Sequence, residues 1–182
     1  MLYQSKMLVD AAAAAGDKFV VHLGAYSSGR DRIPHFCWHG MVETYIKASG
    51  MAWANLHPNV ILDSLLVTEP STIKKGSFDV MWVEAALGWI SAADIGTLAA
   101  AVLREGPEKH AGADYGLSPE NLTGQQAAEI ITQATGTRIT CNVYNSEVLK
   151  AYVASIPDAG TRLYYTSAVQ TTRLGETRQM HY

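Results

Sequence analysis

Two histidines and a glutamate recur at intervals of four in the first third of the chain: His35, His39 and Glu43. Residues four apart lie on one face of a helix, so a helix over about 35–49 would turn all three to the same side. Zinc proteases place a glutamate directly after the first of two such histidines, whereas Phe36 stands here. We therefore expect no metal site, and the plain alternative is a polar face turned to solvent or to a pocket.

The same spacing matches Tyr-x-x-x-Lys, the catalytic pair of short-chain dehydrogenases, with His35 and His39 at the two positions. In that pair the lysine holds a ribose hydroxyl and lowers the pKa of the tyrosine. A histidine at the second position can donate a hydrogen bond but is mostly neutral at pH 7. A histidine at the first could act as a general acid. His35 and His39 are thus the candidate catalytic residues.

Composition narrows the class of protein. The chain has 182 residues, of which 48% are hydrophobic and 17% charged, which suits one globular domain. A net charge of -3 with scattered Lys and Arg gives no patch for nucleic acid or an anionic membrane. Cys37 and Cys141 lie far apart, which favours reduced thiols and a cytoplasmic protein. Charges interrupt the early apolar stretch, so we expect neither a signal peptide nor a membrane segment.

Strands and helices are predicted to alternate along the chain, separated by short loops. This order is typical of an α/β fold with a mainly parallel sheet. The predicted helices are 2–15, 35–49, 60–66, 91–104, 124–135, 146–154 and 158–170. The predicted strands are 19–26, 51–57, 78–83, 111–117 and 138–144.

Several runs of residues, each weak alone, occur together in the order found in NmrA-like proteins, the atypical short-chain dehydrogenase/reductases. The runs are Lys6–Ala12, Val20–His22, Gly40–Tyr45, Ala48–Trp53, Leu56–Asn59, Leu65–Leu66, Ser91–Gly96, His110–Gly112 and Tyr115–Ser118. The chain resembles that family over most of its length.

The resemblance implies an NAD(P)-binding Rossmann fold with a small C-terminal substrate region, in proteins that are quinone or azo-dye reductases or redox sensors. In the family, the loop after the strand ending near Leu56 passes the nicotinamide and carries an Arg-Pro pair, where this chain has His57-Pro58. By this resemblance, NADP or NAD would be the cofactor. The implied cofactor-binding residues are Gly24, Tyr26, Ser27, His39, His57, Pro58 and Asn59.

One family feature does not occur in this sequence. The family's G-x-x-G-x-x-G turn holds the pyrophosphate at a helix N-terminus. The glycine groups at 24–29 and 112–116 have other spacings. We therefore expect the chain to be truncated, starting at the helix before the fifth family strand and stopping before the last family segment. Sheet edges that relatives cover would then favour a homo-oligomer.

Residues 1–182 are expected to form a single NmrA-like domain. Its Rossmann-like part would be 1–69 and 84–104, and its substrate-side region 70–83 and 105–182. The resulting hypothesis is an NAD(P)H-dependent reductase acting on a small molecule. The alternative is a non-catalytic regulatory or truncated binding module without tight dinucleotide binding. A hydrolase is disfavoured because Ser64 and Ser71 lack a G-x-S-x-G context.

Overall fold

The computed structural model describes residues 2–26, 34–64, 73–80 and 86–177. Contacts within the chain divide it into two compact units. Unit 1 comprises Met1–Val60 and Ile90–Pro119, and unit 2 comprises Ile61–Trp89 and Glu120–Tyr182. The chain thus leaves unit 1, returns to it and leaves it again.

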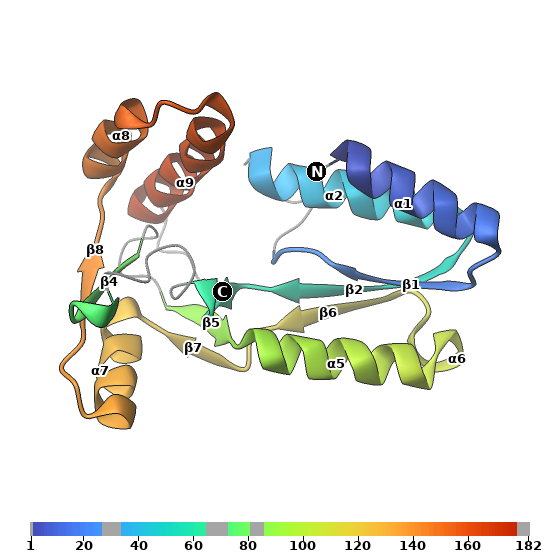
Figure 1. Ribbon diagram of the computed structural model, residues 1–182, viewed down its shortest axis with the longest axis horizontal. Helices are drawn as coiled ribbons and strands as arrows, with labels where there is room; N and C mark the ends of the chain where they lie inside the picture. Colours follow the sequence, from blue (N-terminus) through green and yellow to red (C-terminus); the bar gives the residue numbers. More distant parts are fainter. Residues whose placement is uncertain (1, 27–33, 65–72, 81–85, 178–182) are drawn as a thin grey trace. The chain divides into compact units, whose positions relative to one another are not determined.

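Unit 1 is a three-layered arrangement around a parallel sheet (Figure 1). The sheet has the order β1 (Phe19–Leu23), β2 (Ala52–Pro58), β6 (Ala113–Leu117). One face is covered by α1 (Leu2–Ala15) and α2 (Pro34–Ala48), the other by α5 (Ala92–Glu105) and α6 (Pro107–His110). Cover on both faces explains why these strands read as nearly continuous apolar runs.

The strand register decides which side chains face α2. Paired residues of parallel strands point to the same face and alternate along each strand. At the amino end of the strands, Val20 pairs with Trp53, and both pack against a core cluster of Val9, Val42, Ile46 and Met51. Two residues further along the strands, on the same face, His22 pairs with Asn55 and Asn55 with Asp114. The layer beneath α2 therefore changes from apolar to polar toward the carboxyl end of the sheet.

Local signals set the helix boundaries. Ser91 caps α5, its hydroxyl accepting a hydrogen bond from the Asp94 backbone N–H at 3.0 Å. Thr123 and Gln126 form a reciprocal capping box at the start of α7 (Gly124–Thr135). Gly136 ends α7 in the left-handed conformation, with φ of 69°, which a glycine adopts without strain.

The described residues of unit 2 form two small sheets and the helices α7, α8 and α9. Phe78 and Trp89 meet edge to face in its core, with ring centroids 6.2 Å apart. β4 pairs in parallel with β8, and β5 lies between β3 and an antiparallel β7. The elements are β3 (Val60–Ile61), β4 (Ser77–Val80), β5 (Leu87–Ile90), β7 (Glu120–Leu122), α7, β8 (Thr140–Val143), α8 (Ser146–Ser155) and α9 (Ala159–Thr177).

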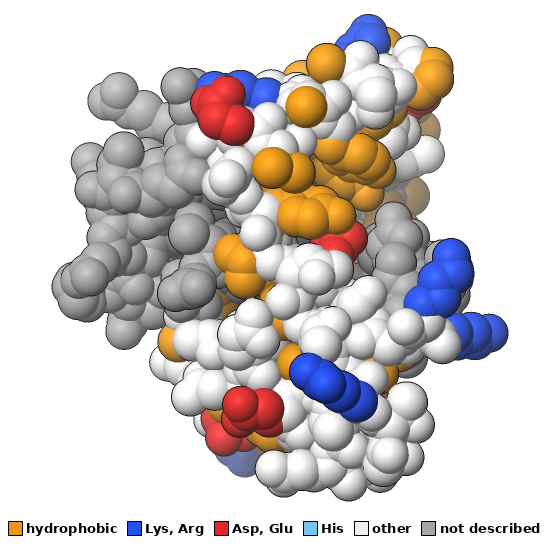
Figure 2. Space-filling view, turned by 90° about the vertical axis from the view of Figure 1, so that its left-hand side faces the viewer, with side chains coloured by type: hydrophobic (Ala, Val, Ile, Leu, Met, Phe, Trp, Pro, Cys, Tyr) orange, Lys and Arg blue, Asp and Glu red, His pale blue; other side chains and the backbone are white. Residues whose placement is uncertain are grey.

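Helices α8 and α9 pack side by side and expose apolar side chains. Figure 2 shows hydrophobic side chains gathered near the top of the face it presents, where α8 and α9 lie. Among the described side chains of these two helices, the large exposed hydrophobic ones are Val148, Tyr152 and Leu163. Within the described ranges, no helix combines the length and hydrophobicity needed to cross a bilayer.

The α/β class with mainly parallel strands is confirmed. The predicted helix over 60–66 is wrong at its start, because Val60–Ile61 pair as β3 beside β5, and residues 65–66 lie outside the described residues. β5 and β7 were not predicted, because both are too short to show a period. Residues 105–119 belong to unit 1, because β6 pairs with β2. Their expected place on the substrate side stays a prediction.

Candidate functional site

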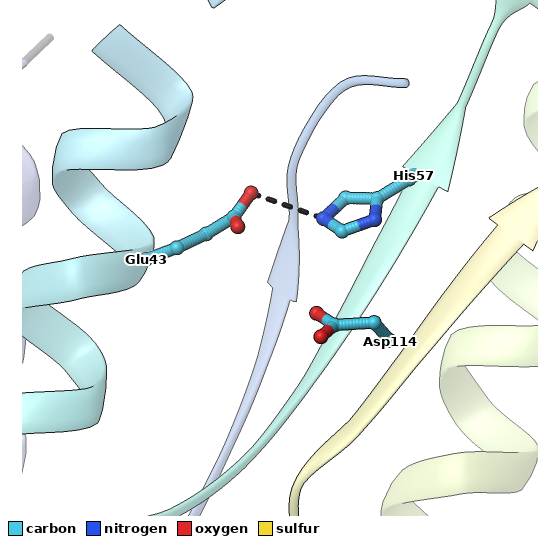
Figure 3. Close-up of side chains that lie close together, drawn as sticks. All are labelled: Glu43, His57 and Asp114. Carbon is cyan, nitrogen blue, oxygen red and sulfur yellow. Dashed lines mark hydrogen bonds and ion pairs between the residues drawn. The ribbon is translucent and has the colours of Figure 1, made fainter. Parts of the chain in front are cut away.

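A histidine and a glutamate meet beneath α2 at the carboxyl end of the sheet. His57 of β2 places its Nε2 3.0 Å from Oε1 of Glu43 of α2 (Figure 3). The Glu43 side chain is 8% exposed and that of His57 16% exposed. Burying a carboxylate costs several kcal/mol unless a partner offsets it, so the hydrogen bond from the imidazole stabilises Glu43 in this position.

Gly24 leaves room for this pair. The chain runs on beyond β1 beside β2, where the Gly24 N–H donates to the Leu56 carbonyl at 2.9 Å. A Cβ at position 24 would come within 2.7 Å of Oε1 of Glu43 and 2.9 Å of Cδ2 of His57. Side chains essentially never approach so closely, so the space is taken by the pair itself.

Asp114 of β6 completes a cluster of three potential ligand side chains with Glu43 and His57. One ligand-type atom from each of the three lies within 4.8 Å of the others. Asn55, which is fully buried, donates from Nδ2 to Oδ1 of Asp114 at 2.7 Å. Lys47 approaches Oδ2 of Asp114 at 3.9 Å and lies over the Trp53 ring, 4.1 Å from its centroid. The cluster therefore combines two carboxylates, one imidazole and one nearby cation.

Two further histidines lie close to the pair. The rings of His22 and His39 have centroids 6.1 Å apart. Nε2 of His22 is buried and has no hydrogen-bond partner among the described residues. Burial lowers the pKa of His22; the Glu43 carboxylate opposes this, while His39 and His57 add to it. His22 is thus held in its neutral form beneath α2.

The structure brings some of the predicted site residues together. Gly24 and His57 are in direct proximity, and the Tyr26 N–H donates to the Pro58 carbonyl at 2.9 Å. A Cβ on Gly116 of β6 would lie 3.7 Å from the Tyr26 ring, so that ring lies against β6. His39 lies beside His22 and not in the Glu43–His57 bond.

The remaining predicted residues are less closely placed. Asn59 follows β2 and is partly exposed. His35 is in α2, but its side chain lies outside what the structure describes, and Ser27 lies outside the described residues. The roles proposed for these three residues stay predictions.

Sequence reasoning missed four members of the site: His22, Glu43 as a partner of His57, Asn55 and Asp114. A signal for Asn55 was present, because Asn55 and His57 are two apart in a strand and so share a face. Asp114 could not be found this way, because only the pairing of β6 with β2 brings it to Asn55.

Comparison with known proteins agrees with this architecture. Residues 1–173 match the NmrA-like family. The NAD(P)H azoreductase of Xenophilus azovorans is 28% identical over 165 residues, which are 86% of this chain and 57% of that protein. The chain therefore spans somewhat more than half the length of this relative.

Two solved structures show the same fold. The NADPH-dependent quinone oxidoreductase of Escherichia coli, solved with NADPH, has a TM-score of 0.73 at 21% identity, covering 93% of this chain and 61% of that one. The negative transcriptional regulator NmrA, solved with NAD, has a TM-score of 0.71 at 19% identity, covering 94% and 56%. These likenesses confirm the predicted Rossmann-like fold class.

Replacing Gly24 by alanine should displace the Glu43–His57 pair. The added methyl group overlaps both side chains, and overpacking of this kind costs about 1–3 kcal/mol. Urea denaturation should show a loss of unfolding free energy in that range for Gly24→Ala. The control is Gly116→Ala, whose methyl group would meet only the Tyr26 ring at 3.7 Å. Equal stability losses in the two variants would contradict the steric role of Gly24.

The partly buried His22 should make stability depend on pH. Its folded-state pKa is lowered from the model-compound value of 6.5, so below about pH 6.5 the unfolded chain binds more protons than the folded one. The free energy of unfolding should be at its full value above that pH and fall as the pH drops below it. His22→Gln should lose less stability than the wild type between about pH 7.5 and about pH 5.5. Parallel pH profiles would exclude His22 as the cause.

Proposed function

This chain belongs to the NmrA-like family, and we propose that it forms the nicotinamide-side wall of an NAD(P)H-dependent reductase acting on a quinone or azo compound. The relatives named above include an NAD(P)H azoreductase and an NADPH-dependent quinone oxidoreductase.

The observation that carries the proposal is the buried Glu43–His57 pair at the carboxyl end of the parallel strands. In open α/β sheets, ligands bind outside the carboxyl ends of the strands. A core position there normally holds an apolar side chain, whereas here it holds a hydrogen-bonded carboxylate and imidazole. A fixed polar group at this edge is suited to a polar ligand.

The residues at this edge fit the nicotinamide part of a dinucleotide. An imidazole whose Nε2–H donates a hydrogen bond to Glu43 keeps Nδ1 as an acceptor, which matches the amide N–H of a nicotinamide carboxamide. Tyr26, fixed by its backbone bond to Pro58, offers a ring beside β6. When bound, a reduced nicotinamide would supply a hydride. The sequence offers no G-x-x-G-x-x-G turn for the pyrophosphate, so the fit concerns the nicotinamide end.

His35 and His39 keep their proposed catalytic role on α2, and Ser27 and Asn59 their proposed place at the cofactor. His39 is supported by its position on α2, where its ring lies beside that of His22 and one turn before Glu43. A histidine there can donate a hydrogen bond to a ribose hydroxyl. His35 would then stand one turn further toward the start of α2.

A second candidate is a non-catalytic binding module. The NmrA regulator, whose fold this chain shares, is described as a negative transcriptional regulator and was solved with NAD. A protein of this kind would bind a dinucleotide at this wall without catalysing a reaction. Binding and turnover therefore have to be measured separately. The cytoplasmic location indicated by the cysteines stays a prediction.

Titration with NADPH and NADH, followed by the melting temperature, tests the proposal. A ligand at a hundred times its dissociation constant adds about 2.7 kcal/mol to stability. ADP-ribose is the matched control, because it keeps the pyrophosphate and lacks the nicotinamide. We expect stabilisation by a reduced dinucleotide, little by ADP-ribose, and dinucleotide oxidation with a quinone that His39→Gln slows. Stabilisation without turnover would favour the binding module, and no stabilisation by either dinucleotide would refute both.

We also propose that the protein forms homo-oligomers. Among the described residues, β1 pairs with β2 alone, so one edge of this parallel strand has unpaired backbone groups. Such edges tend to pair with another chain. Light scattering at micromolar concentration should give at least twice the 19.7 kDa mass of one chain. A clean monomer would overturn this part of the proposal.

A further inference from the structure

The cluster of Glu43, His57 and Asp114 has the composition of a cation site. Its three side chains come from α2, β2 and β6, and their potential ligand atoms lie within 4.8 Å of one another. Figure 3 shows the Glu43 carboxylate directed at the His57 ring, with the Asp114 carboxylate nearby. Among the described residues, this is the one group of three such side chains close enough to share an ion.

Asn55 provides an independent indication. Its side chain is fully buried, and its Nδ2 donates to Asp114 at 2.7 Å, so its amide lies at the cluster. Its Oδ1 is buried without a hydrogen-bond partner among the described residues. Exchanging the two amide atoms would not help, because Oδ1 would then face a carboxylate. An unsatisfied oxygen acceptor on the amide that bonds Asp114 is a position that a cation, or a water bound to one, would satisfy.

We propose that Glu43, His57 and Asp114 bind a divalent transition-metal ion of the Zn²⁺, Co²⁺ or Mn²⁺ class, an assignment that goes beyond the reductase function and does not depend on it. One imidazole with two carboxylates suits these borderline ions. Asn55 holds Asp114 from outside the ligand set, as second partners commonly do.

The distances require one adjustment. Ligand atoms about 2.0–2.2 Å from a tetrahedral ion lie roughly 3.4 Å apart. Oε1 of Glu43 and Nε2 of His57, at 3.0 Å, are already near this spacing. The ion takes the place of the Nε2 proton that bonds Glu43 in the ion-free protein, because an imidazole binds a metal through a deprotonated nitrogen. Asp114 has to move closer to the other two ligands. It can do so because its side chain is 48% exposed and, in the described part of the chain, Lys47 at 3.9 Å is the one ion-pair partner of its Oδ2. An ion would enter the site from solvent at the exposed side of Asp114.

The fold contains a matched control. His110 and Glu105 form a second pair, with Nε2 and Oε2 also 3.0 Å apart. Nδ1 of His110 is bonded to the Tyr115 hydroxyl at 2.7 Å, and no third ligand side chain joins this pair among the described residues. Binding that depends on a cluster of three should therefore distinguish the two pairs.

The test is a Co²⁺ titration of the full chain after treatment with a chelator, without any dinucleotide, followed by the visible absorption of the ion and by calorimetry. We expect one site per chain, visible bands typical of a nitrogen and oxygen ligand set, and displacement by Zn²⁺. Asp114→Asn, at an exposed position that should not endanger folding, should weaken binding at least about 10-fold. His57→Gln should abolish the bands. His110→Gln should leave binding unchanged.

The outcomes separate clearly. No Co²⁺ binding, or equal binding by the wild type and Asp114→Asn, would overturn the assignment. Loss of binding in His110→Gln but not in Asp114→Asn would overturn it as well, because the ion would then sit at the other pair. Since no dinucleotide is present, each result is independent of the reductase proposal.

Discussion

The burial of the Glu43 carboxylate between a helix and a sheet is the constraint on which the polar part of unit 1 depends. A carboxylate 8% exposed is tolerated only with a hydrogen-bond donor, and His57 supplies it. That requirement bears on position 24, where glycine leaves the space of the pair free and a larger residue would displace the two side chains. Removing one partner of such a pair typically costs about 3–5 kcal/mol, so helix, strand and loop are tied to one another here.

The layer of side chains under α2 has an apolar half, which stabilises the fold, and a polar half, which can contact a ligand. At the amino end, Val9, Val42, Ile46 and Met51 form an apolar core that fixes the helix to the sheet. At the carboxyl end, the same layer contains histidines, carboxylates and an amide. The apolar half carries the hydrophobic stabilisation, at roughly 25 cal/mol per Å² buried. The polar half can therefore serve a ligand without being the main source of stability.

Much of this fold could be predicted from local sequence signals, and the reasons are specific. The ends of α7 could be predicted from Thr123 and Gly136, because helix capping depends on residues close in sequence. The strand β1 was recognisable as a continuous apolar run. The strand at Val60–Ile61 was misjudged because its pairing with β5 comes from far along the chain. For the site, His57 was identified through the family resemblance. Asp114 was not, because its place depends on register and not on spacing in the sequence.

The bond between Asn55 and Asp114 has a consequence for folding specificity. Successive side chains of a strand face opposite sides, so a slip of β6 by one residue would turn Asp114 toward α5 and α6. Asn55 would then be buried with neither of its amide atoms satisfied. Apolar strands such as β1 and β2 could pair in several ways with little difference in hydrophobic burial. The buried amide of Asn55 donates to Asp114 in one alignment of the strands alone. This hydrogen bond therefore selects one sheet among the competing alignments.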